Sequence, residues 1–182
     1  MRHRMRRRFP GGRRRSGRFG RGLRRSLQGE ETLTKGIVIF DSKYGNTERV
    51  AQALASGLKG EGLEVECVRC DRVPMDRLKE YDFLAIGGPT QYGTISKPLE
   101  EFLRRVSPAD VRGKKAFAFD TRYADERAGS AAKDIQRRLE PLGLGIVRPH
   151  ASAIVLGGEG PLEEGAEEAF KRIGADLAKR LR

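Results

Sequence analysis

Residues 37–50 read IVIFDSKYGNTERV. Four apolar residues, 37–40, are followed by a short polar stretch, and a helical pattern then begins in which Val50, Leu54 and Leu58 recur every four residues. A buried strand, a turn and an amphipathic helix in this order form the first half of a βαβ unit. The stretch therefore predicts an α/β domain with parallel strands.

The same alternation continues to the end of the chain. Further strand-like runs are expected at 65–68, 83–86, 116–119 and 146–155. The helical patterns between and after them cover 99–106, with Ser96 as the expected cap, 131–139, 166–177 and a short helix at 74–80. Five strands that alternate with helices indicate a parallel sheet covered on both faces.

The charge of the chain is concentrated at its beginning. The sequence up to Arg25 holds twelve arginines and no acidic residue, and the first acid is Glu30. Removing these twelve from the 37 basic residues leaves 25, which equals the 25 acids, so the net charge of +12 belongs to this segment. Its few apolar residues are not expected to offset the chain entropy lost on folding. We therefore expect a disordered basic tail, 1–34, and a neutral folded domain, 35–182.

The tail has several interpretations. Its arginines, with Phe9 and Phe19 between them, are typical of segments that bind nucleic acid through charge and stacking. The alternatives are an electrostatic tether to an acidic partner or anionic lipid, and an upstream start codon that adds residues absent from the native protein. No hydrophobic stretch follows the tail, so we expect no signal peptide, no transmembrane segment and a cytoplasmic location.

Cys67 and Cys70 form a C-x-x-C pattern that we do not expect to be functional. Both are placed on a predicted strand, where positions three apart face opposite sides. The chain has no further cysteine, and its histidines are only His3 and His150, so a zinc site cannot be completed. We therefore expect no metal site.

Three loops follow the ends of predicted strands, where ligands bind in open α/β sheets. The first, 42–47, combines hydroxyls and a glycine with a helix start, whose unpaired amides attract an anion. The second, GGPTQYGTISKP at 87–98, and the third, DTRYADERAGSAA at 120–132, each carry a tyrosine. A phosphate site beside two aromatic loops favours a planar phosphorylated cofactor, which FMN fits. The simpler alternatives are a capped turn and two surface loops.

Two motifs in this order, DSKYGNTERVA at 41–51 and AIGGPTQYGTISKPLEEFL at 85–103, resemble the flavodoxin family. Within it, the resemblance is closest to the flavodoxin-type domains of flavodiiron (A-type) flavoproteins, and it covers 35–182. It implies a flavodoxin-like three-layer fold, with a five-stranded parallel sheet in the order 2-1-3-4-5 and helices on both faces. It also implies noncovalent FMN, through which electrons pass.

Carried over by position, the FMN-binding residues fall into two groups. Those at the phosphate would be Ser42, Lys43, Tyr44, Gly45, Asn46 and Thr47. Those around the ring would be Pro89, Thr90, Gln91, Tyr92, Gly93, Thr121, Arg122 and Tyr123. No catalytic residue is assigned, and carboxylates near the ring are expected to disfavour its reduced anionic form.

The chain departs from the family pattern in three respects. It has no tryptophan to stack on the flavin, its domain is neutral rather than acidic, and it lacks the histidine and carboxylate cluster of a diiron site. The expected function is electron transfer with a redox partner protein. The alternatives are an FMN-dependent NAD(P)H:quinone oxidoreductase, and a flavodoxin-fold protein whose basic tail binds nucleic acid. A receiver domain is rejected because Gly87 and Gly88 stand where its acceptor aspartate is required.

Overall fold

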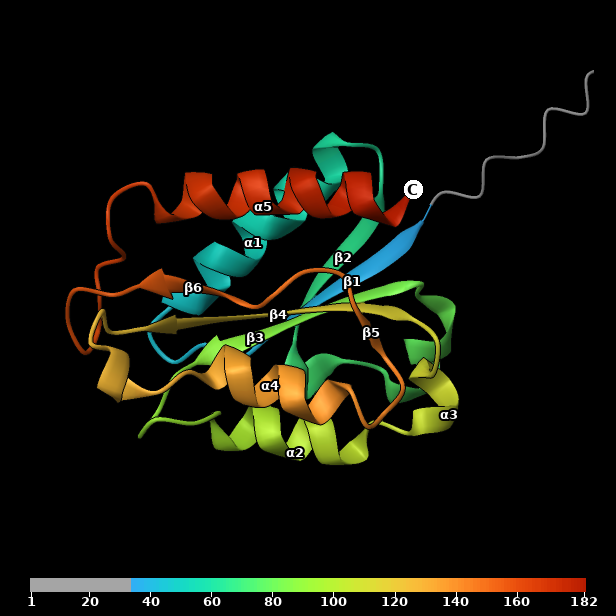
Figure 1. Ribbon diagram of the computed structural model, residues 1–182, viewed down its shortest axis with the longest axis horizontal. Coiled ribbons are helices and arrows are strands. Elements are labelled where there is room, and N and C mark those ends of the chain that lie inside the picture. Colours follow the sequence, from blue (N-terminus) through green and yellow to red (C-terminus); the bar gives the residue numbers. More distant parts are fainter. Residues whose placement is uncertain (1–33) are drawn as a thin grey trace, which may run out of the picture. The chain divides into compact units, whose positions relative to one another are not determined.

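The computed structural model describes residues 34–182, in which a parallel sheet lies between two layers of helices (Figure 1). The expectations for the tail, its disorder and its contacts with nucleic acid, concern residues 1–33 and lie outside the described residues. Within 34–182, no helix is both long enough and apolar enough to cross a membrane.

The sheet has the predicted strand order. Its strands are β1 (Lys35–Phe40), β2 (Glu64–Arg69), β3 (Phe83–Pro89), β4 (Lys115–Arg122), β5 (Gly145–Ile146) and β6 (Ala151–Ile154). They are ordered β2-β1-β3-β4-β5, β6 also pairs with β4, and all of these pairs are parallel. The prediction of a 2-1-3-4-5 sheet is therefore confirmed.

The prediction of one continuous last strand at 146–155 is wrong. The structure divides it into β5, which pairs with the start of β4, and β6, which pairs with the end of β4. Pro149 lies between the two pieces and has no backbone N–H to donate to the sheet, so the ladder is interrupted there.

The helices are α1 (Asn46–Gly60), α2 (Lys97–Arg105), α3 (Pro108–Val111), α4 (Ala131–Leu139) and α5 (Ala166–Leu181), with the 3₁₀ helices η1 (Cys70–Arg72), η2 (Met75–Glu80) and η3 (Glu126–Ala128). The short helix predicted at 74–80 is present as the 3₁₀ helix η2, a form typical of short connectors. Ser96 has the position predicted for it, the N-cap of α2, but its side chain does not cap the helix. Its hydroxyl donates instead to Asp41 Oδ2 at 2.6 Å.

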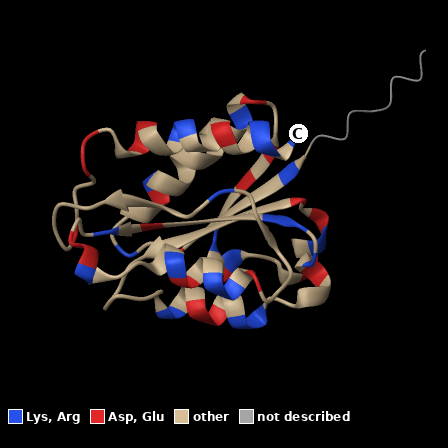
Figure 2. Ribbon diagram, viewed as in Figure 1, with Lys and Arg blue, Asp and Glu red and all other residues tan. Residues whose placement is uncertain are grey.

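The alternation of side chains along the strands builds two apolar cores. Ile37 and Ile39 belong to the core under α2 and α4, whereas Val38 and Phe40 belong to the core under α1 and α5. Figure 1 shows the two helix pairs on opposite faces of the sheet. Charged residues lie mainly on the outer helices and the connections, and much of the central sheet is uncharged (Figure 2).

Cys67 and Cys70 are free thiols on opposite sides of the sheet. Cys67 packs against the α1 side, and Cys70 belongs to the core on the α2 side, in η1 rather than on the predicted strand. Burial raises the pKa of both thiols to about 11. At neutral pH both are therefore protonated and poor nucleophiles.

Helices α1 and α5 cross with almost no space between their backbones. A Cβ atom added to Gly57 of α1 would lie 2.0 Å from the carbonyl oxygen of Lys171. One added to Gly174 of α5 would lie 2.3 Å from the carbonyl oxygen of Leu54. This contact holds the last turns of α1 against α5, and the other end of α1 begins at the predicted phosphate loop.

Candidate functional site

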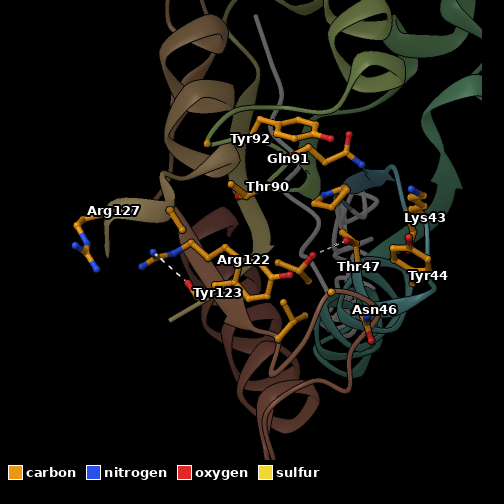
Figure 3. Close-up of a pocket in the computed structure, with 17 residues that line it drawn as sticks. Lys43, Tyr44, Asn46, Thr47, Thr90, Gln91, Tyr92, Arg122, Tyr123 and Arg127 are labelled. Atoms are coloured by element: carbon orange, nitrogen blue, oxygen red, sulfur yellow. Dashed lines mark hydrogen bonds between the residues drawn. The ribbon is translucent and has the colours of Figure 1, made fainter. Parts of the chain in front are cut away.

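A pocket of about 680 Å³ lies where the carboxyl ends of β1, β3 and β4 meet (Figure 3). It is lined by all the predicted cofactor-binding residues except Gly45, so the structure brings the three predicted loops together. It is also lined by four residues that were not predicted, namely Arg127, Ala128, Val155 and Gly158. Val155 and Gly158 follow β6, and the rule that ligands bind beyond strand ends would have indicated this fourth segment.

Gly45 shapes the pocket without lining it. It is the N-cap of α1 with φ of 84°, in the left-handed region that favours glycine. No side chain caps the helix, and its first intrahelical bond runs from Arg49 N to Gly45 O. The side chain of Asn46, the first residue of α1, donates from Nδ2 to the carbonyl of Glu159 at 3.0 Å. The first turn of α1 therefore keeps amides available for an anion.

Two hydroxyl groups lie beside this helix start. Ser42 Oγ is buried and has no hydrogen-bond partner among residues 34–182. Thr47 is buried too, and its Oγ1 lies 2.7 Å from Thr121 Oγ1. In such a pair one hydroxyl donates to the other, so the accepting hydroxyl keeps its own proton for a further acceptor. Thr121, predicted beside the ring, thus lies next to the phosphate loop.

Asp120 joins the second loop to the start of α4. Its fully buried carboxylate accepts from Thr90 Oγ1 at 3.0 Å, Ser130 Oγ at 2.7 Å and Ala132 N at 3.0 Å, all through Oδ2. Ser130 also caps α4 by accepting from Lys133 N. Sequence reasoning missed this role of Asp120, because no local pattern shows which loop residues a strand residue contacts in the folded chain.

The second loop contains a tight turn that presents an aromatic ring. Gln91 and Thr94 exchange backbone hydrogen bonds, and the two residues between them have positive φ, 50° at Tyr92 and 82° at Gly93. This is the pattern of a type I′ turn, in which the first central position favours asparagine or glycine rather than tyrosine. The Tyr92 side chain is fully exposed, and its backbone is strained.

Exposed apolar side chains gather at the pocket. Within the part of the chain that the structure describes, the large exposed ones are Tyr44, Tyr92, Tyr123 and Leu156. The three tyrosines line the pocket, and Leu156 directly follows the lining residue Val155. Exposed aromatic groups around a concave site are typical of a surface that stacks on a planar ligand.

The charges on the pocket wall are positive. Among the described residues that line it, the charged ones are Lys43, Arg122 and Arg127. No carboxylate is among these lining residues, and the expectation that carboxylates lie near the ring stays a prediction. Asp41 directly follows β1, and Asp120 lies within β4; both are buried. Asp41 is bonded to Arg69 and Ser96, whereas Asp120 is bonded through Oδ2 and its Oδ1 has no partner among residues 34–182.

The family model for flavodoxin matches residues 38–173. The chain belongs to the flavodoxin family. Proteins of this family bind FMN noncovalently, and FMN is accordingly the cofactor of this chain. The unpaired Ser42 hydroxyl and the uncapped helix start are donors that suit the phosphate of this nucleotide.

Individual relatives agree with this assignment. A flavodoxin of Aquifex aeolicus is 29% identical over 162 residues, which cover 81% of this chain and 86% of that protein. A solved flavodoxin from the domain Archaea is 26% identical, with a TM-score of 0.71 and coverage of 81% and 98%. An NAD(P)H dehydrogenase (quinone) of Paraburkholderia phymatum is 29% identical over 101 residues, 44% of this chain and 51% of that one. The chain spans only about half the length of several curated relatives that it matches.

Proposed function

We propose that this chain transfers electrons through FMN held in the pocket, with the phosphate at 42–47 and the ring between the Tyr92 turn and Tyr123. The observation that supports this most directly is Ser42 Oγ, a buried hydroxyl without a partner among residues 34–182. A buried polar group that no protein atom satisfies is costly, and a ligand oxygen at this place would remove the cost.

In this proposal the residues that line the pocket have different roles in FMN binding. Ser42, the hydroxyl pair of Thr47 and Thr121, and the first amides of α1 would hold the phosphate oxygens. Tyr92 and Tyr123 would cover the ring and exclude water, while Asp120 holds Thr90 and hence the second loop in place. FMN itself supplies the capacity to accept and release electrons.

A comparison of FMN with riboflavin tests the phosphate site. The full chain, freed of flavin, is titrated with each compound while flavin fluorescence is followed. We expect riboflavin to bind at least 10-fold more weakly, because hydrogen bonds to a charged group contribute about 1.5–3 kcal/mol each. Equal affinities for the two compounds would place the phosphate outside the loop at 42–47.

A second candidate is an FMN-dependent NAD(P)H:quinone oxidoreductase. It is supported by the quinone dehydrogenase relative and by the pocket, whose exposed tyrosines could stack on a second planar ring. Reductive titration separates the two functions. Two resolved one-electron steps favour a carrier of single electrons, whereas steady turnover of NADPH with a quinone favours the oxidoreductase.

Tyr92→Asn is expected to act in opposite directions on stability and on FMN binding. Asparagine tolerates positive φ, so the free energy of unfolding of the FMN-free protein should rise by about 1 kcal/mol. Loss of the aromatic ring should weaken FMN binding by about 1 kcal/mol. Urea unfolding and FMN titration measure the two effects. Tyr44→Asn, at a residue without positive φ, is the control and should not stabilise the protein.

For the tail we propose an electrostatic contact with nucleic acid or another polyanion, supported by its twelve arginines. Deleting residues 1–30 should abolish salt-sensitive retention on RNA and leave FMN affinity unchanged. Loss of both properties would contradict the division into tail and domain. The cytoplasmic location expected from the sequence stays a prediction, which cell fractionation tests.

A further inference from the structure

Arg122 holds a positive charge on the pocket wall in a fixed position. Its Nε donates to Ser152 Oγ at 3.1 Å, and its Nη1 lies 3.5 Å from the carbonyl oxygen of Tyr123 and 3.4 Å from that of Asp125. All three acceptors are neutral, and within residues 34–182 Arg122 forms no ion pair with a carboxylate. The guanidinium charge is therefore oriented but not neutralised.

The other cation on this side of the pocket is different. Arg127 donates from its backbone N, Nε and Nη2 to the carboxylate of Asp125, at 2.9, 3.1 and 3.1 Å. These contacts hold the pKa of Asp125 below its usual range, as expected for a neutralising pair. The Arg127 side chain is also 91% exposed, so solvent screens its charge.

The position of Arg122 relative to the phosphate loop is also informative. Figure 3 shows Arg122 and Arg127 on one side of the pocket, with Lys43 and Tyr44 on the other. If the phosphate of a ligand binds at the start of α1, beside Lys43, Arg122 belongs to the opposite wall of the pocket. Its charge is then on the side away from the phosphate.

We infer that Arg122 raises the reduction potential of the bound flavin through its unneutralised charge on the pocket wall. The inference rests on the proposed function. Addition of two electrons, taken from a reductant, and one proton to the ring leaves it with one additional negative charge. A nearby cation stabilises this product more than the neutral starting ring, so it favours reduction.

The test is the midpoint potential of the FMN-loaded full chain, measured by spectroelectrochemical titration, together with the Kd for oxidised FMN. In Arg122→Gln, we expect binding of the reduced cofactor to weaken about 10-fold more than binding of the oxidised one. This ratio corresponds to a potential about 30 mV lower for a two-electron couple. Arg122→Lys retains the charge and should retain most of the potential.

Arg127→Gln is the matched control, since it changes the net charge equally at a screened position of the same pocket. Its potential should shift by less than a third as much. If Arg122 only holds the loop, its loss weakens oxidised and reduced FMN equally and leaves the potential unchanged, which would overturn the inference. An equal shift in Arg127→Gln, or no retention in Arg122→Lys, would overturn it as well.

The experiment also distinguishes failure of FMN binding and failure of the Arg122 variant to fold from failure of the inference. If the unaltered chain fails to bind FMN, the proposed function fails first, before any potential is measured. If Arg122→Gln does not fold, Arg122→Met removes the same charge and keeps the aliphatic stem. The same shift is then expected, and its absence is evidence against the inference.

Discussion

Replacing Gly174 with alanine is expected to lower the free energy of unfolding by about 3 kcal/mol, the upper part of the range for overpacked interiors. The added Cβ would lie 2.3 Å from the carbonyl oxygen of Leu54 and 3.0 Å from the amide nitrogen of Leu58. Both neighbours are backbone atoms of α1, so no side chain can rotate away. The two helices have to separate, and the apolar contacts between them are lost.

Urea denaturation of the FMN-free protein measures this effect. Gly60→Ala is the matched control, because Gly60 ends α1 and an added Cβ there has no neighbour within 4 Å. We expect that variant to be unchanged or more stable by up to about 1 kcal/mol, since alanine is the better helix former. Equal stabilities for the two variants would mean that α1 and α5 do not pack as closely as described.

The fold was predictable because it depends on patterns that repeat along the chain. Apolar runs alternating with helical stripes indicated the parallel sheet, and the resemblance of the motifs at 41–51 and 85–103 to the flavodoxin family implied its strand order. The break between β5 and β6 was missed because the flanking apolar residues hid the effect of Pro149. The α1–α5 contact was missed because Gly57 and Gly174 are 117 positions apart, a separation at which no local pattern pairs them.

The members of the site were easier to predict than their partners. The residues of the first loop could be identified, because a strand end, hydroxyls and a helix start are adjacent in sequence. The sequence could not identify which of these hydroxyls lacks a hydrogen-bond partner, because the partners come from residues distant in the chain. Thr47 is hydrogen-bonded to Thr121, 74 positions away, whereas Ser42 Oγ has no hydrogen-bond partner in the part of the chain that the structure describes.

This difference makes Ser42→Ala the most informative substitution at the site. In the FMN-free protein it removes a buried hydroxyl that has no partner within residues 34–182, so the free energy of unfolding should rise by about 1 kcal/mol. FMN affinity should fall by about 1.5–3 kcal/mol, the contribution of a hydrogen bond to a charged group. Stability and affinity thus change in opposite directions.

Two controls test the explanation. Riboflavin lacks the phosphate, so Ser42→Ala should leave its affinity unchanged. Ser130→Ala removes a hydroxyl that donates to Asp120 and caps α4, and it should destabilise the FMN-free protein by about 1–2 kcal/mol. If Ser42→Ala destabilises the FMN-free protein as well, or weakens riboflavin as much as FMN, then the Ser42 hydroxyl is not reserved for a phosphate oxygen, and the anion must bind elsewhere along α1.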